Sequence, residues 1–82
     1  MKVIKIYNKQ FKILGRKIAY YRGLKNLSQV QLAKKVGIST SYLSKIERAD
    51  LESISLATLM QIALGLELPT YILLKFNEEE EF

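Results

Sequence analysis

The amino-acid sequence predicts an all-α fold in which five short helices surround one small core. Three observations support this prediction. Apolar residues recur at intervals of three and four along most of the chain, serines stand where helix N-caps are expected, and 82 residues suffice for only one core. With 49% apolar and 26% charged residues, the composition is that of a globular rather than a disordered chain.

The N-terminal segment is expected to precede the first helix as a short arm. Residues 2–7 are rich in β-branched and aromatic side chains, which favours an extended arm or an edge strand within residues 1–8. Asn8 is a candidate N-cap for the first helix, which we expect to end near Arg22. The apolar residues of this helix recur on one face: Phe11, Leu14, Ile18 and Tyr21.

Two further helices are predicted over residues 29–36 and 40–48, each preceded by a serine. Ser28 and the glutamine three residues after it have the Ser-x-x-Gln form of a capping box. Gly37 ends the first of these helices, at a position that favours left-handed backbone. Ser39 is the expected N-cap of the second.

The remainder of the chain is predicted to contain two helices and a tail. Ser55 is placed to cap a fourth helix over residues 56–65, and a fifth follows the only proline, over residues 71–76. We therefore expect one folded domain over residues 9–76 and an acidic tail over residues 77–82.

Charge and composition restrict the kinds of function. Residues 1–48 hold 12 of the 13 basic residues and one acid, Glu47, which suggests an anionic polymer or surface as partner. Without cysteine or histidine, the chain lacks thiolate and imidazole ligands, nucleophiles and bases, so we expect neither a metal or cofactor nor an enzyme. No apolar run is as long as a membrane span or a signal sequence, and we expect a cytoplasmic domain.

Residues 29–46 have the pattern of two helices joined by a tight turn. Ala33 is small where such helices approach each other, and Gly37 suits the turn, while Leu43 and Ile46 would anchor the second helix in the core. The outward face of that helix would hold polar and basic side chains: Thr40, Ser41, Ser44, Lys45 and Arg48. Such a helix fits the major groove of DNA, where lysine reaches guanine O6 and N7. The alternative is an ordinary helix pair with a solvated face.

Several motifs occur in order between residues 11 and 74: Leu14-Gly-Arg-Lys-Ile18, Leu27-Ser-Gln29, Val36-Gly37-Ile-Ser39, Ser41-Tyr-Leu-Ser-Lys-Ile-Glu-Arg48 and Ser55-Leu56-Ala-Thr-Leu59. Together they resemble the XRE family, the lambdoid-repressor and Cro-like helix-turn-helix regulators of bacteria, phages and plasmids. The resemblance implies a compact five-helix, lambda-repressor-like DNA-binding domain with residues 39–48 as its recognition helix. Small controller proteins of restriction–modification systems belong to the same family.

The resemblance also implies roles for individual residues. Thr40, Ser41 and Lys45 match the positions that meet base edges. Phosphate or peripheral contacts are implied for another group: Gln29, Ser39, Tyr42, Ser44 and Arg48. Arg22 and Glu47 match an architectural ion pair, and an arginine fork on a carboxylate would fix the angle between their two helices. With Ala33 and Gly37, this pair is interpreted as structural.

The sequence departs from the family pattern at several places. Asn26 and Ala49 stand where glycine is usual; asparagine tolerates positive φ, whereas Ala49 suggests a different loop path. The loop of residues 49–54 is acidic where many relatives are basic. Val30 and Lys34 replace the acids with which some phage relatives activate transcription, so repression is the favoured sign of regulation.

The last predicted helix carries more apolar surface than one thin core can cover. Four of its residues are assigned to a dimer interface: Tyr71, Ile72, Leu74 and Phe76. A homodimer would place two recognition helices about 34 Å apart on a pseudo-palindromic operator. The alternative is that all four complete the core of a monomer.

Two functions are compatible with these features. The favoured one is a sequence-specific transcription regulator that binds operator DNA as a homodimer. The other is an antitoxin-like or adaptor module whose main partner is a protein, with DNA binding secondary or autoregulatory. In that case the apolar last helix and the N-terminal arm would form the protein interface.

Overall fold

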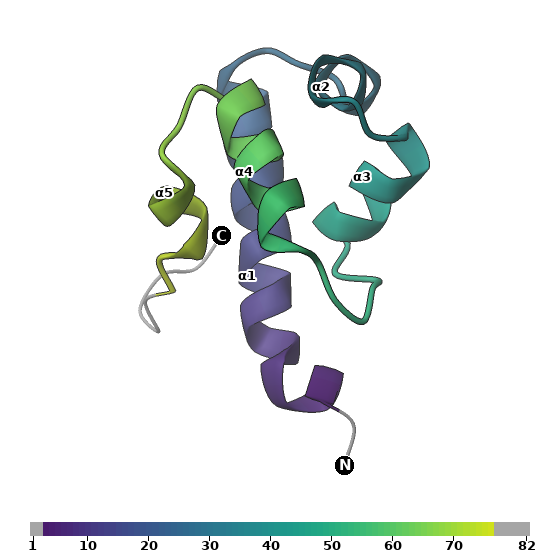
Figure 1. The fold of residues 1–82 in the computed structure, drawn as a ribbon, viewed down its shortest axis with the longest axis vertical. Coiled ribbons are helices and arrows are strands. Elements are labelled where there is room, and N and C mark those ends of the chain that lie inside the picture. The colour runs from purple at the N-terminus through teal and green to yellow at the C-terminus, as the bar shows by residue number, and fades with distance from the viewer. Residues whose placement is uncertain (1–2, 77–82) are drawn as a thin grey trace.

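The computed structural model describes the backbone of residues 3–76 and the side chains of residues 8–76. The predicted all-α fold of five helices is confirmed for this part of the chain, which contains no strand (Figure 1). The helices are α1 (Val3–Leu24), α2 (Gln29–Val36), α3 (Thr40–Glu47), α4 (Leu56–Gly65) and α5 (Thr70–Leu74). The expected acidic tail lies outside the described residues.

The start of α1 differs from the prediction. The helix begins at Val3 rather than after Asn8, so the segment expected to be an arm or edge strand is helical from its third residue. The reason is visible in the sequence, because Ile4 and Tyr7 continue backwards the three-and-four spacing of the helical face. This periodicity outweighs the small helix penalty of β-branched residues.

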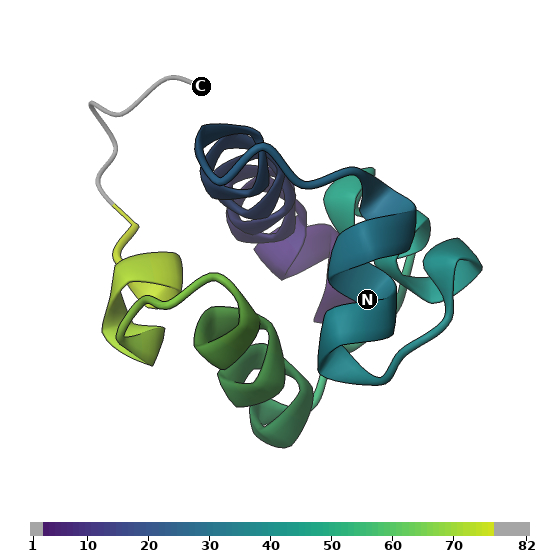
Figure 2. The same ribbon diagram turned by 90° about the horizontal axis from the view of Figure 1, so that it is seen from above.

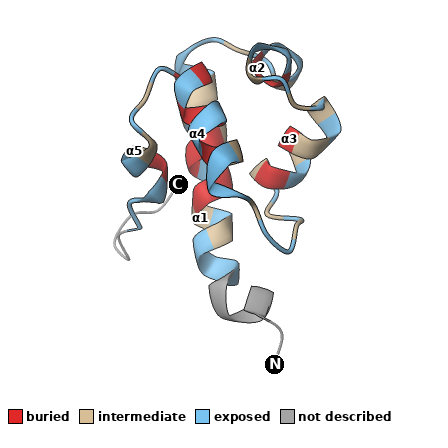
Figure 3. Cartoon of the chain, viewed as in Figure 1, coloured by how far each residue is buried: buried red, intermediate tan, exposed pale blue. Residues whose placement is uncertain are grey.

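The helices are arranged around α1, which runs the length of the molecule with α3 on one side and α5 on the other (Figures 1 and 2). Helix α2 packs on α3 and α4, and α4 packs on α5. Buried residues from all five helices face this common centre (Figure 3). The largest fully buried side chains are Ile18, Leu32, Leu43, Ile46, Ile62, Leu66 and Leu73.

Three serine N-caps place the starts of α2, α3 and α4 where the sequence predicted them. The hydroxyls of Ser28, Ser39 and Ser55 each accept the backbone N–H three residues later, at 3.0 Å. At α2 the capping box is complete, since the Gln31 side chain accepts the Ser28 N–H at 2.8 Å.

Left-handed residues follow the first four helices: Asn26, Gly37, Ala49 and Glu67. After each of them, the next N–H donates to a carbonyl five residues back, which is the long bond of a Schellman motif. The different loop path expected from Ala49 is therefore wrong. Ala49 takes φ of 57°, the conformation in which glycine is usual, because the Asp50 N–H bond to Lys45 at 2.8 Å holds the turn.

Candidate nucleic-acid interface

Helices α2 and α3 pack together as the helix-turn-helix pattern predicts. Ala33 is fully buried between neighbouring helices, and Gly37 ends α2 with φ of 78°. On α3, Leu43 and Ile46 are buried in the core. These anchors turn the opposite side of α3 towards solvent.

The outward side of α3 is polar and basic. Ser41, Lys45 and Arg48 are exposed, and Thr40 and Ser44 are partly exposed. The only acid between residues 40 and 48 is Glu47, and its side chain is 6% exposed because it turns inward. The accessible surface of α3 therefore presents hydroxyl donors and positive charge without an acid.

Several of the expected phosphate-contacting residues already have partners within the domain. The Ser39 hydroxyl accepts the Tyr42 N–H, which leaves its own O–H available to donate. Arg48 Nε donates to the Ser44 carbonyl and hydroxyl oxygens at 3.3 Å, and Arg48 Nη1 lies 3.8 Å from a carboxylate oxygen of Asp50. Arg48 thus lies back along α3, held by contacts that are exposed and easily exchanged for a ligand.

An ion-pair network joins α1, α2 and α3 behind the exposed face. Arg22 Nε and Nη2 donate to the two carboxylate oxygens of Glu47 at 2.8 and 3.0 Å, which is the bidentate pair that the resemblance to the family implies. The Gln29 side-chain amide donates to the same carboxylate at 2.9 Å, and Arg22 Nη1 donates to the Leu27 carbonyl at 2.9 Å.

This network has electrostatic and structural consequences. The hydrogen bonds that Arg22 donates to the Glu47 carboxylate raise the pKa of Arg22, against the opposing effect of partial burial. Because Gln29 leans on Glu47, its side-chain carbonyl and its backbone N–H at the start of α2 are the groups left to face a ligand. The network thereby sets the position of α2 relative to α3.

The sequence matches the helix-turn-helix family over residues 18–73, which include all of α2, α3 and α4. The protein belongs to the XRE helix-turn-helix family. The family members that are similar to this protein are DNA-binding transcription regulators.

Two relatives illustrate the similarity to the family. The transcriptional regulator SinR of Bacillus licheniformis is 34% identical over 70 residues, which are 85% of this chain and 63% of SinR. A crystal structure shows SinR, described as the master regulator for biofilm formation, in complex with DNA. The present structure matches it with a TM-score of 0.73 at 35% identity, and the match covers 76% of this chain and 98% of the SinR chain. The restriction–modification controller C.AhdI from Aeromonas hydrophila has a TM-score of 0.74 at 28% identity, covering 77% and 94%.

The match to SinR therefore spans less than two thirds of the curated relative. SinR has also been solved in a complex with the protein SinI, a structure that has a TM-score of 0.71 at 36% identity and covers 74% of this chain and 59% of that one. The family thus includes a relative with both a DNA and a protein partner.

Two kinds of feature are absent from the part of the chain that the structure describes. Within residues 3–76, no helix is long and apolar enough to cross a membrane. The same part of the chain brings together no group of three acids that could hold a metal ion.

Three residues with important contacts were missed by the sequence reasoning. A Cβ on Gly15 would lie 2.5 Å from the Glu47 carbonyl oxygen, so α1 passes directly against the end of α3. Gly65 has an equally close neighbour in Val36 of α2. Lys17 is buried, and its ammonium donates to the carbonyls of Ile72 and Lys75 at the end of α5. For Gly15, the signal in the sequence is its place directly after Leu14 and about one turn before Ile18 on a core-facing helix.

A second surface, on α4 and α5, is apolar and open. Tyr71 is 67% exposed, Leu74 and Phe76 are also exposed, and Ile72 is partly buried; Leu73 alone of this helix fills the core. Most of the four predicted interface residues therefore do not complete the monomer core. A shallow groove of about 380 Å³ lies beside them, lined by Met60, Gln61, Leu64, Leu68, Pro69 and Thr70.

Proposed function

We propose that the protein is a sequence-specific transcription regulator that binds a pseudo-palindromic operator as a homodimer. The observation that carries this proposal is the outward face of α3, which is basic and free of accessible acids while Leu43 and Ile46 hold it rigidly to the core. The SinR–DNA structure, at a TM-score of 0.73, supports the same mode of binding. In this mode α3 enters the major groove.

Roles within the interface are proposed from the resemblance to the family together with the exposure of each side chain. We assign base-edge contacts to Thr40, Ser41 and Lys45, which are exposed or partly exposed on α3, and lysine is suited to guanine O6 and N7. The surrounding groups would hold phosphates: Gln29, Ser39, Tyr42, Ser44 and Arg48. These contacts position the domain on the duplex, whereas the base contacts give sequence discrimination.

The homodimer is proposed to form through the apolar surface of α4 and α5. Tyr71, Leu74 and Leu64 are exposed large apolar side chains on adjacent helices, and such contiguous surface is typical of interfaces. A single domain contacts too few base pairs for a useful specificity ratio, and pairing two domains doubles the sequence that is recognised.

Selection from a random duplex library at near-physiological salt tests the proposal. We expect recovery of a palindrome whose half-sites lie about one helical turn apart. Recovery of nothing above background, with binding that disappears as salt rises, would show attraction by charge alone and refute sequence-specific regulation.

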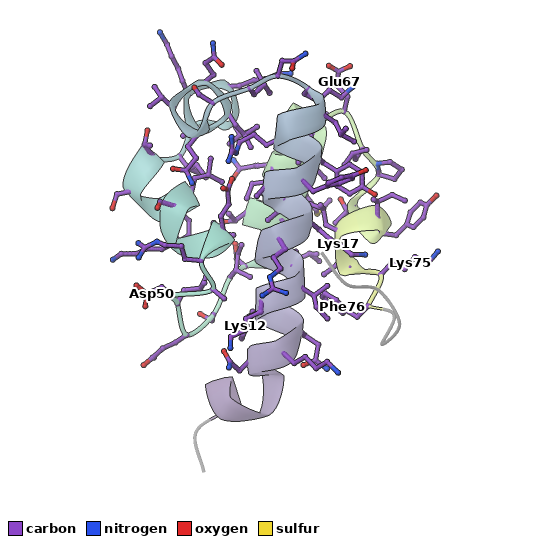
Figure 4. All side chains as sticks on the ribbon, turned by 180° about the vertical axis from the view of Figure 1, so that it is seen from behind. Lys12, Lys17, Asp50, Glu67, Lys75 and Phe76 are labelled. Carbon is purple, nitrogen blue, oxygen red and sulfur yellow. The ribbon has the colours of Figure 1, made fainter. Side chains whose placement is uncertain are left out.

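The recognition-helix assignment is tested with Lys45→Ala and Thr40→Ala. Each variant should lose about 1–3 kcal/mol of discrimination between the selected operator and its mismatched form. Lys75→Ala, on the opposite side of the domain, is the matched control and should keep full discrimination (Figure 4). Unchanged operator preference in both α3 variants would mean that another surface contacts the bases.

The dimer surface is tested by sedimentation in the absence of DNA. Tyr71→Glu should convert the dimer to monomers, because it places a charge in an apolar interface. Val30→Glu changes an equally exposed residue of α2 and should leave the dimer intact. Dimers that persist in the Tyr71 variant would place the interface elsewhere.

The alternative function, a module whose main partner is another protein, is favoured by the SinR–SinI complex and by the same apolar surface. Purification from the native host distinguishes the two. A stoichiometric protein partner that Tyr71→Glu releases, together with no selected operator, would favour the interaction module.

Repression is the proposed sign of regulation. Val30 is exposed and apolar, and Lys34 is exposed and basic, at the places where some phage relatives present acids to activate transcription. Transcription from a promoter that contains the selected operator should fall as the protein is added. A rise would show activation through a different surface.

A further inference from the structure

Helix α1 extends well beyond the end of the recognition helix. It has 22 residues and hence a length of about 33 Å at 1.5 Å per residue. Its close approach to α3 occurs at Gly15, whose Cβ position lies against the Ile46 and Glu47 carbonyls at the last turn of α3. The part of α1 before Gly15 therefore runs past the point where α3 ends and the chain continues through Arg48.

The face of α1 that contacts the end of α3 continues along the helix towards its N-terminus. Its members recur at intervals of three and four: Asn8, Lys12, Gly15, Ala19 and Arg22. Arg22 and Gly15 on this face contact the end of α3. Lys12 stands one turn further, where α3 no longer covers the face, and it is exposed. Figure 4 shows Lys12 on the same side of α1 as Asp50 and on the opposite side from Lys75.

The loop beside Lys12 is poorly suited to hold DNA. Asp50 and Glu52 are exposed there, and Asp50 draws Arg48 to 3.8 Å. Helix α1, by contrast, contains no acid, and Lys9 and Arg16 add positive charge on the side of α1 next to Lys12. Positive charge at this edge of the interface is therefore supplied by α1 rather than by the loop that follows α3.

We propose that Lys12 binds a backbone phosphate of the DNA that flanks the half-site, so that the interface extends from α3 onto the N-terminal half of α1. This inference rests on the proposed function. Asn8, exposed one turn before Lys12 on the same face, is placed to donate a second hydrogen bond to the same strand. The contact adds affinity without adding base discrimination, because phosphates carry no sequence information.

The test compares Lys12→Gln with Lys75→Gln. Both variants remove one charge from an exposed lysine, on opposite sides of α1 (Figure 4). Binding of the wild type to its selected operator is measured first, across a series of salt concentrations. For Lys12→Gln, the slope of log affinity against log salt should become shallower by about 1.8, the value for two phosphates, because the homodimer loses one contact at each half-site. The wild-type advantage should then shrink by about 12-fold between 50 and 200 mM salt. Lys75→Gln should leave the slope unchanged.

A second measurement uses duplexes of different length. On an operator trimmed to the edges of its half-sites, the flanking phosphates are absent and Lys12→Gln should bind as tightly as the wild type. Equal slopes for the Lys12 and Lys75 variants, or loss of base discrimination in Lys12→Gln, would overturn the proposal. Failure of the wild type to select an operator would instead refute the proposed function, so the two failures are distinguishable.

Discussion

The Arg22–Glu47 pair offers a quantitative test of how the helices are held. The Glu47 side chain is 6% exposed and that of Arg22 is 20% exposed. Arg22→Met would leave the Glu47 carboxylate with one remaining donor, the Gln29 amide at 2.9 Å. Because removal of one partner leaves a charge buried without compensation, we expect the free energy of unfolding to fall by about 3 kcal/mol, at the lower end of the range for buried pairs.

Two further variants, Glu47→Gln and the double variant, complete a double-mutant cycle that separates the interaction of the pair from the contacts of each side chain with its surroundings. Glu47→Gln keeps the shape but removes the charge, and should cost about 2 kcal/mol, since Arg22 retains the Leu27 carbonyl and some solvent. The double variant leaves no unpaired buried charge and should lower the free energy of unfolding by about 2 kcal/mol, less than Arg22→Met alone. The coupling between the two side chains is then about 3 kcal/mol.

Urea unfolding followed by helical circular dichroism measures these free energies. Arg22→Met should also lower the melting temperature by roughly 15 °C for a domain of this size. The pair raises the pKa of Arg22, so its contribution is complete below the unfolded pKa and is lost only at strongly alkaline pH; the coupling should therefore be constant between about pH 6 and 9. Additive single variants, to within about 0.5 kcal/mol, would refute this reasoning.

Three further stability predictions can be checked by the same unfolding assay. Gly15→Ala should lower the free energy of unfolding by about 3 kcal/mol, because the added Cβ would lie 2.5 and 2.6 Å from backbone oxygens of α3. Gly23→Ala, which has open space around it, is the control and should be neutral or slightly stabilising. Equal effects of the two substitutions would contradict the close approach of α1 to α3. Ala49→Gly should stabilise the domain by about 0.5 kcal/mol, because the strain energy of left-handed alanine exceeds the entropic cost of a more flexible unfolded chain. A loss of stability would show that no strain is stored at this residue. Lys17→Met should lower the free energy of unfolding by about 2 kcal/mol, because the carbonyls at the end of α5 lose their donor. If the amides of α5 were as well protected from hydrogen exchange in this variant as in the wild type, Lys17 would not be what holds α5 in place.

Local chemistry made most of the helix boundaries predictable. A serine cap needs only a backbone N–H three residues later, so Ser28, Ser39 and Ser55 could be recognised without knowing the rest of the fold. The start of α1 is harder to predict, because the β-branched residues of segment 2–7 favour a strand while their spacing favours a helix. The pattern of three and four was already present there.

Long-range contacts were harder to predict, for a physical reason. Burial of Lys17 depends on carbonyls 55 and 58 residues later in the chain, and nothing near Lys17 in the sequence signals them. The Arg22–Glu47 pair is also distant in sequence, at 25 residues, but a resemblance to a known family supplied it. The pattern of residues alone does not show which lysine finds an acceptor and which remains in solvent.

The division of α3 into two faces has a consequence for how new specificities can arise. Its stability comes from Leu43 and Ile46, which are almost fully buried, and from the Ser39 cap. Thr40, Ser41 and Lys45 take no part in those contacts that hold the helix in place. Mutations at these three positions can therefore accumulate without eroding the fold. Under the proposed function, a gene duplicate could then acquire a new operator in a few steps, and the surface that contacts DNA would be evolvable independently of the scaffold that carries it.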